Sequence, residues 1–360
     1  MGAVSQVEAW SVLEHGKPLR KTTRPFHSPT GSEVVVKVTH CGVCHSDVHL
    51  WEGFFELGGN RGRVAVEDAG VELPRAVGHE IVGEVVAVGP DVEPAEVSIG
   101  DRRIVYPWIG CNKPGCVRCQ NEEDNLCESP ANLGMTADGG FASHVVVSHA
   151  RYLIDFGNVN PALACTYSCS GITVLSAIQK LMPMRPENPI VLIGAGGLGI
   201  QAIAMLKALG HQAIISVDVA KDKRAVAELA GAQYVCGSGE GVKKEIIGMA
   251  ARPILGTIDF VNNSSTAQLA YDILTKGGHM VQVGIMGGEL SLSLVAFIFK
   301  AVTVSANMTG NLKHLREVVQ MAREGKLAAI PVTEIPWDEA NVALMRLRDG
   351  KVKGRLILKV

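Results

Sequence analysis

Three features that would direct a chain to nucleic acid or to a membrane are missing from this sequence. The net charge is −2 and no basic run stands out, so the chain has no positive field to attract phosphate. Apolar runs such as 202–209 fall well short of the roughly 20 residues that cross a bilayer. The first six residues lack the positive-then-apolar pattern of a signal peptide. We expect a cytoplasmic protein that binds neither nucleic acid nor membrane.

Size and composition describe an ordinary globular chain. With 360 residues, of which 47% are hydrophobic and 19% charged, the chain is long for one core and comfortable for two domains.

Nine cysteines are more than the packing of a cytosolic chain requires, and their grouping favours metal over disulfides. Four of them, Cys111, Cys116, Cys119 and Cys127, form a C-x4-C-x2-C-x7-C pattern. The segment between them holds only two other apolar side chains, Val117 and Leu126, so it cannot order itself by burial, whereas four thiolates around one zinc would. Four unligated thiols are one alternative. A nucleic-acid-binding zinc ribbon is another, although the acidic run 122–124 repels phosphate.

A second group of metal ligands begins in the stretch 39–53, directly after the β-like run 33–38. Cys44 beside His45 is a weak signal alone, because a buried Cys next to a surface His is common. Downstream, His79 and Cys169 would complete a set of three protein ligands. Three ligands leave a tetrahedral zinc with one open position, which is typical of a catalytic rather than a structural zinc.

Two halves of the chain follow different patterns. Up to about residue 169, short strands alternate with Gly and Pro, as in an irregular barrel-like domain; we expect strands at 34–38, 81–88, 103–106 and 144–147. The segment 54–75 reads as a long surface loop. From about 170, strands and helices alternate as in a parallel sheet covered by helices on both faces: helices at 172–181, 198–209, 221–230 and 268–274, and strands at 190–193, 213–217, 258–261 and 279–283. Helix-like segments at 311–324 and 338–348 precede a last strand at 355–359.

The strongest single motif is a dinucleotide-binding loop at the start of this second half. Gly194, Gly196 and Gly199 form GxGxxG, with Gly197 and Leu198 between them, directly after the strand 190–193. The first glycine permits a tight turn, the second lets the backbone approach a pyrophosphate, and the third allows close helix packing. Asp218, which ends the next strand, would accept hydrogen bonds from the adenosine ribose and so favours NAD over NADP.

The pattern Gly78-His79-Glu80-x2-Gly83-x5-Gly89, together with residues 42–47 (GVCHSD), resembles the signatures of the zinc-dependent medium-chain alcohol dehydrogenases. The likeness spans nearly the whole chain. It implies an α/β protein with a discontinuous GroES-like β-rich catalytic domain (1–169 and 306–360) and a Rossmann doubly wound parallel-sheet domain for NAD (170–305). Compared with that family, the segment 54–75 looks like an insertion, and the first gap of the four-cysteine pattern holds four residues where two are usual.

The resemblance also implies roles for individual residues. The catalytic zinc goes to Cys44, His79 and Cys169, with Cys165 as the competing thiol, and the structural zinc goes to the four-cysteine loop. Asp47 and Glu80 would orient the ligating imidazole. His45, Lys223, Val283 and Arg355 would join the glycine loop in binding NAD.

The implied reaction is reversible hydride transfer between NAD and a primary or secondary alcohol, cyclic and aromatic alcohols included, with zinc holding the substrate oxygen. Ser46 and His49 would carry the proton to solvent. Phe55, Trp108 and the pair Ile285-Met286 are expected to line an apolar pocket. A specialised substrate such as a polyol or a hydroxy-acyl thioester is the alternative within the family; a zinc-free quinone reductase relative and a purely structural zinc protein are the alternatives outside it. We expect a homodimer or a homotetramer.

Overall fold

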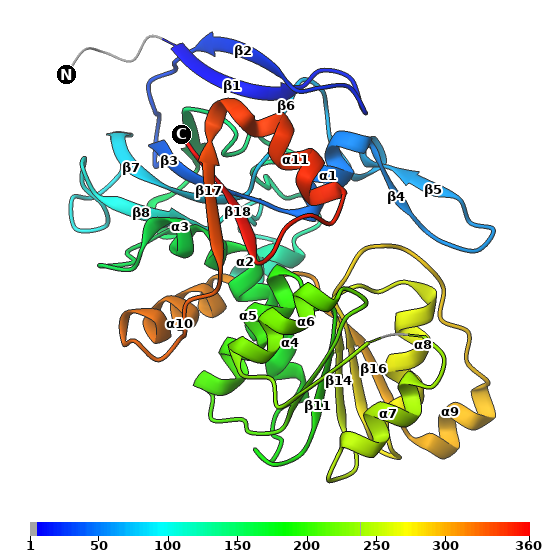
Figure 1. Cartoon of the computed structure of the whole chain (residues 1–360). Helices are drawn as coiled ribbons and strands as arrows, with labels where there is room; N and C mark the ends of the chain where they lie inside the picture. The colour runs from blue at the N-terminus through cyan, green and yellow to red at the C-terminus, as the bar shows by residue number, and fades with distance from the viewer. Residues whose placement is uncertain (1–5, 238) are drawn as a thin grey trace.

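The computed structural model describes residues 6–237 and 239–360, and these form two lobes joined through helix α4, Ser170–Leu181 (Figure 1). The chain leaves the first lobe before α4 and returns to it after strand β16, Thr303–Ala306.

The first lobe is built from mostly antiparallel sheets of short strands; β17 and β18 are a parallel pair. Its central seven-stranded sheet runs β10-β8-β7-β3-β18-β17, with β9 also paired to β3. A three-stranded sheet, β2-β1-β6, and a two-stranded one, β4-β5, complete the lobe. The strands are β1 Gln6–Val12, β2 Arg20–Pro25, β3 Val34–Val43, β4 Phe54–Glu56, β5 Arg63–Ala65, β6 Arg75–Ala76, β7 Glu80–Val88, β8 Arg102–Val105, β9 His144–Val147, β10 Leu153–Ile154, β17 Val332–Pro336 and β18 Arg355–Lys359.

Strand β3 is the centre of this sheet, because it pairs with β7, β9 and β18. Its valines at 34, 35 and 36 are fully buried, and two register shifts against β7 bend the ladder as bulges do. The helices that accompany the sheet are α1 His45–Glu52, α2 Val117–Gln120, α3 Pro161–Ala164, α10 Leu312–Arg323 and α11 Ala340–Arg348.

The second lobe is a parallel six-stranded sheet in the order β13-β12-β11-β14-β15-β16. Numbered from its first strand, this is 3-2-1-4-5-6, the doubly wound order of dinucleotide-binding folds, whose ligands lie at the carboxyl edge. Its strands are β11 Ile190–Ile193, β12 Ile214–Val217, β13 Tyr234–Cys236, β14 Gly256–Asp259, β15 His279–Gln282 and β16; its helices are α5 Gly197–Ala208, α6 Lys221–Ala230, α7 Val242–Met249, α8 Ser264–Ile273 and α9 Leu294–Lys300. β11 is buried throughout, as a strand covered on both faces should be.

The structure confirms the parallel α/β sheet. Several elements differ from the expected bounds by a few residues, such as β3, β14 and α8, and the largest difference lies at residues 54–75. Residues 54–75 are not a plain surface loop, because β4 and β5 pair as a hairpin and a 3-10 turn, Val66–Ala69, follows. Glycines at 58, 59 and 62 adopt positive φ and make the turn, so the glycine run that suggests a loop is the tip of a hairpin.

β17 and β18 lie in the sheet of the first lobe, which supports the predicted discontinuous domain without fixing its boundaries. Among the described residues, no single helix is long and apolar enough to span a bilayer; a bent pair, 161–168 with 170–181, has the length and composition but is a largely buried core element.

Candidate metal centres and dinucleotide site

The first metal-ligating set lies where the two lobes meet. Cys44 caps the N-terminus of α1 directly after β3, His79 precedes β7, and Cys169 precedes α4. One ligand atom from each of the three lies within 4.8 Å of the others, and the two sulfurs are 3.9 Å apart. His79 and Cys169 are buried and Cys44 is half-buried, so the set faces a sheltered space.

Asp47 holds this set together from one side. Its buried carboxylate accepts hydrogen bonds from the backbone N–H of Cys44 (2.8 Å) and of Gly78 (2.9 Å), and its Oδ1 lies 3.2 Å from Nδ1 of His79. One side chain therefore anchors two ligand-bearing segments and orients the imidazole, which is the work of an outer partner in metal sites.

The donor chemistry of the set fits zinc. A hydrogen bond from Cys169 lowers the pKa of Cys44 well below its usual range, so a thiolate forms readily. Burial opposes protonation of His79, yet the Asp47 carboxylate and the Cys44 sulfur hold its pKa well above normal, as expected beside groups that attract a cation. Its Nε2 is buried and makes no hydrogen bond within the part of the chain that the structure describes, which leaves it free to face a metal. Two sulfurs and one imidazole are a known catalytic-zinc set.

Cys165 is not part of the set. It is fully buried, its thiol contacts the carbonyl oxygen of Ala162 at 3.3 Å, and burial raises its pKa. It packs as a small apolar residue, as expected for the competing thiol.

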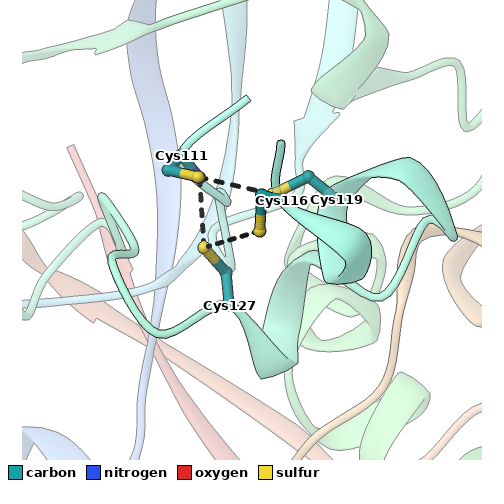
Figure 2. Close-up of side chains that lie close together, drawn as sticks. All are labelled: Cys111, Cys116, Cys119 and Cys127. Carbon is teal, nitrogen blue, oxygen red and sulfur yellow. Dashed lines mark hydrogen bonds between the residues drawn. The ribbon is translucent and has the colours of Figure 1, made fainter. Parts of the chain in front are cut away.

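The second set is the four-cysteine loop (Figure 2). Cys111, Cys116, Cys119 and Cys127 converge with all four sulfurs within 4.8 Å of one another. Backbone donation from Cys119 lowers the pKa of Cys116 to about 7, whereas burial raises that of Cys119 to about 12. In the first gap Asn112 takes a φ of 53° and the next residues form a turn closed by a hydrogen bond from Cys116 N–H to the Lys113 carbonyl (3.0 Å), and Cys111 still reaches the cluster. Four thiols close a tetrahedral zinc completely.

A buried carboxylate that the sequence reasoning missed stands beside this loop. Asp124 is fully buried and accepts hydrogen bonds from Arg151 (2.8 Å) and from the Tyr152 hydroxyl (2.8 Å). The acidic run 122–124 therefore contributes one residue to the interior.

Glu80 lies elsewhere than the resemblance implied. Its carboxylate pairs with the Arg355 guanidinium, and no contact joins it to the His79 ring among the described residues. Both side chains are buried, and burial without this pairing would be costly for either charge. Among the described residues, Asp47 is therefore the carboxylate placed to orient the imidazole, while Glu80 and Arg355 link β7 to β18.

The dinucleotide loop has the shape its sequence predicts. Gly194 adopts a φ of 96°, and a Cβ on Gly199 would overlap the carbonyl oxygen of Gly194, so both positions require glycine. Around Gly196 nothing lies within 4 Å of where a Cβ would be, which leaves the backbone open to a ligand at the N-terminus of α5. Gly197 packs on the Arg355 side chain, so the arginine lies under the loop that would bind a pyrophosphate.

Asp218 follows β12 and points back to this loop. Its two oxygens accept hydrogen bonds from the backbone N–H of Ala195 (2.7 Å) and Ala220 (2.8 Å), which still leaves lone pairs for hydroxyl groups. Lys223 is half-buried in the first turn of α6, and Val283 is half-buried directly after β15.

The remaining predicted site residues differ in their burial and in their contacts with the first metal set. Ser46 Oγ is 3.9 Å from the Cys44 sulfur, and the His49 ring packs at a tilt against Phe55 with centroids 5.0 Å apart. Trp108 is buried, donates to the carbonyl of Ser168 (3.1 Å) and packs on the His79 ring at 5.2 Å. His45 is exposed at the start of α1, and Ile285 and Met286 are exposed in the loop after β15.

Fold and site together define a class: a two-lobed protein with a dinucleotide fold, one open three-ligand metal set and one closed four-thiol set. Comparison with known proteins agrees. Residues 30–157 match the description "Alcohol dehydrogenase GroES-like domain", and residues 197–324 match "Zinc-binding dehydrogenase".

An NAD-dependent alcohol dehydrogenase of Sulfurisphaera tokodaii is 35% identical over 98% of this chain and 99% of its own length. The crystal structure of an alcohol dehydrogenase from Aeropyrum pernix superposes with a TM-score of 0.88 at 29% identity, covering 98% of this chain and all of that one. A D-arabinose 1-dehydrogenase (NADP(+)) of Saccharolobus solfataricus is 28% identical over 99% of both chains.

The chain belongs to the zinc-dependent medium-chain alcohol dehydrogenase family. This confirms the predicted fold class, a GroES-like domain with a Rossmann-like one, and makes the protein an oxidoreductase.

Proposed function

We propose that this protein is a zinc- and NAD-dependent alcohol dehydrogenase, which transfers hydride reversibly between a primary or secondary alcohol and NAD. The observation that carries the proposal is the open three-ligand set of Cys44, His79 and Cys169 at the lobe junction, in a chain 35% identical to an NAD-dependent alcohol dehydrogenase. NAD reduction by the purified protein with an alcohol panel tests it; turnover that needs neither NAD nor metal would contradict it.

Zinc held by these ligands would supply a Lewis acid that stabilises negative charge on the substrate oxygen. The residues of this chain would position the metal ligands and restrict water at the site. Asp47 fixes the imidazole and the two backbone segments that bear the ligands, so the donors keep their geometry through the reaction. Trp108 covers the His79 ring and restricts water there.

The substrate proton needs a route out of this sheltered site. The Ser46 hydroxyl, beside the Cys44 sulfur, is placed to take it first, and His49, one turn further along α1, is placed to pass it on. Burial lowers the pKa of His49, so its ring is neutral near pH 7 and able to accept a proton.

NAD is the expected cofactor because Asp218 presents a carboxylate where a 2′-phosphate would lie. Repulsion and the loss of hydroxyl hydrogen bonds together favour NAD by a few kcal/mol, or about a hundredfold in kcat/KM. Asp218→Gly should narrow this preference mainly by damaging the use of NAD. Comparable kcat/KM values for NAD and NADP in the unmodified enzyme would contradict the assignment.

The substrate is a medium-sized apolar alcohol, with Phe55, Trp108 and Ile285 as pocket walls. A sugar or other polyol is the second candidate, favoured by the resemblance to the D-arabinose dehydrogenase and by the amides of Asn262 and Gln282 near Ile285. A panel of cyclic, aromatic, aliphatic and polyhydroxy alcohols, compared by kcat/KM, separates the two.

The expected homodimer or homotetramer has a candidate surface in the second lobe. β16 is one of the two edge strands of the parallel sheet, and α9, which directly precedes it in the chain, exposes Leu294, Val295, Ile298 and Phe299. An unpaired edge with an apolar neighbour is favourable for pairing with a second copy. Light scattering after size exclusion measures the state. We also propose that the two domains divide at residues 169/170 and 305/306. We propose the cytoplasm as the location of the protein.

A further inference from the structure

The hairpin β4-β5 reaches from the first lobe toward the second. Figure 1 shows it extending beside the loop that leads to α9. Its tip, Leu57–Gly62, is a compact turn in which the N–H of Leu57 donates to the carbonyl of Gly62 (2.9 Å) and that of Arg61 to Gly58 (3.1 Å). Such a tip is a defined surface rather than a loose loop.

The tip contacts the second lobe at backbone level. A Cβ on Gly58 would overlap Cα of Gly288, and a Cβ on Gly287 would overlap the carbonyl oxygen of Glu56. Glycines on both sides therefore let two main chains from different lobes touch, which side chains would prevent.

The partner loop is itself anchored. The backbone of Glu289 donates to Ser264 Oγ at 2.8 Å, and Gly287 forms a bridge with Asn263, the residue that caps α8. Arg61 and Glu289 form an ion pair of 3.0 Å across the contact, but both are exposed, so this pair adds little. The glycine contact is the main connection.

A cavity of about 430 Å³ lies beneath this contact. It is lined by Phe55 and Leu57 of the hairpin and by Asn262, Gln282 and Ile285 of the second lobe. The last three follow or end β14 and β15, so the cavity opens on the carboxyl edge of the parallel sheet, where ligands of this fold bind. Phe55 also packs on His49 of the proposed proton route.

We propose that Glu56–Gly62 and Gly287–Glu289 form an interdomain strap that closes over the nicotinamide end of the cofactor cleft and must open to admit and release the dinucleotide. This inference rests on the proposed function. In this structure the strap is closed, so entry and exit both wait for the same opening. Weakening the contact should therefore raise the association and dissociation rates of NADH together and change the affinity little.

The test compares Gly58→Ala with Gly62→Ala. Both glycines lie in the same turn with similar positive φ, 80° and 70°, so alanine carries a similar backbone cost at each. Only at Gly58 does the new methyl group meet the second lobe, because nothing lies within 4 Å of a Cβ on Gly62. The pair thus separates loss of the strap from strain in the hairpin.

Stopped-flow fluorescence of NADH with the zinc-loaded enzyme measures both rates. We expect Gly58→Ala to raise each by about tenfold, with Kd within about twofold, and Gly62→Ala to match the parent. Hydrogen exchange in the absence of cofactor should be faster at the amides of Leu57, Arg61 and Glu289 in Gly58→Ala only. Equal rates and equal exchange in the two variants would overturn the strap alone. A parent protein that binds no NADH would overturn the proposed function, and the strap proposal with it.

Discussion

The two cysteine clusters of this protein differ in what surrounds their sulfurs. In the four-cysteine loop, Cys111 and Cys116 are half-buried, all ligands come from 17 consecutive residues, and the set is closed. The Cys44–His79–Cys169 set takes one ligand from each of three distant segments, lies at the junction of the lobes and leaves one position open. A zinc in the first arrangement would hold a loop together, whereas a zinc in the second would be open to a substrate.

A buried carboxylate accepts backbone or side-chain hydrogen bonds beside each cluster, Asp47 at the three-ligand set and Asp124 at the four-cysteine loop, and the two have different partners. Asp47 accepts from the ligand-bearing backbone and contacts the ligating His79, whereas Asp124 accepts from Arg151 and Tyr152. Asp47 therefore positions the residues of the three-ligand set, whereas Asp124 attaches the four-cysteine loop to the rest of the first lobe.

The largest effect is expected from Cys169→Ser, which removes one of three ligands. Because Lewis-acid stabilisation is worth several kcal/mol, turnover should fall by about 10³-fold or more. NADH binding should survive, since its site lies in the second lobe. Cys165→Ser is the matched control and should retain both metal and activity. Metal loss in the Cys165 variant with retention in the Cys169 variant would reverse the ligand assignment.

Exchanging the carboxylates for amides sharpens the comparison. Asp47→Asn should lower zinc affinity and kcat by about 10- to 100-fold, because an outer partner of the ligands is lost. Asp124→Asn should leave kcat intact and reduce the melting temperature, because a buried charged hydrogen-bonding group is weakened. Competition with a chelator measures the change in zinc affinity, and thermal melting measures the change in stability. The comparison fails if both variants change the same property.

A smaller, pH-dependent effect is expected at His49. Since burial lowers its pKa, the ring stays neutral at pH 7, and alcohol oxidation should decline only as the pH falls below the ordinary value of 6.5 and the ring becomes protonated. His49→Gln should slow oxidation about tenfold at neutral pH and flatten this acidic decline. A pH profile of kcat measured for the parent and for His49→Gln checks this prediction. The four-cysteine loop takes no part in this pH effect. An unchanged profile would place the proton route elsewhere.

Much of this could be predicted from the sequence because its signals are local. The glycine loop, the cysteine spacing and the alternation of strands and helices each depend on neighbours in the chain, and the structure places them as expected. Asp47 was also predictable, because it sits three residues from Cys44 in the first turn of α1.

Contacts between distant segments could not be predicted. The pairing of Glu80 with Arg355 joins residues 275 positions apart, and only the register of β18 against β3 and of β3 against β7 reveals it. Likewise the glycines of 58–62 suggest a loop until their contact with Gly287 and Gly288 is seen. Glycine in a sequence predicts a bend but does not say what approaches it.

The central claim is that one cluster serves chemistry and the other serves the fold, and metal analysis of three proteins tests it most directly. The parent should contain two zinc ions per chain. Cys169→Ser should contain one, melt like the parent and be inactive. Cys119→Ser should contain one, remain active at low temperature, and melt lower by roughly 2–4 °C for each kcal/mol that its loop zinc contributes. A Cys119 variant that is inactive but as stable as the parent, or a parent with one zinc or none, would contradict the account.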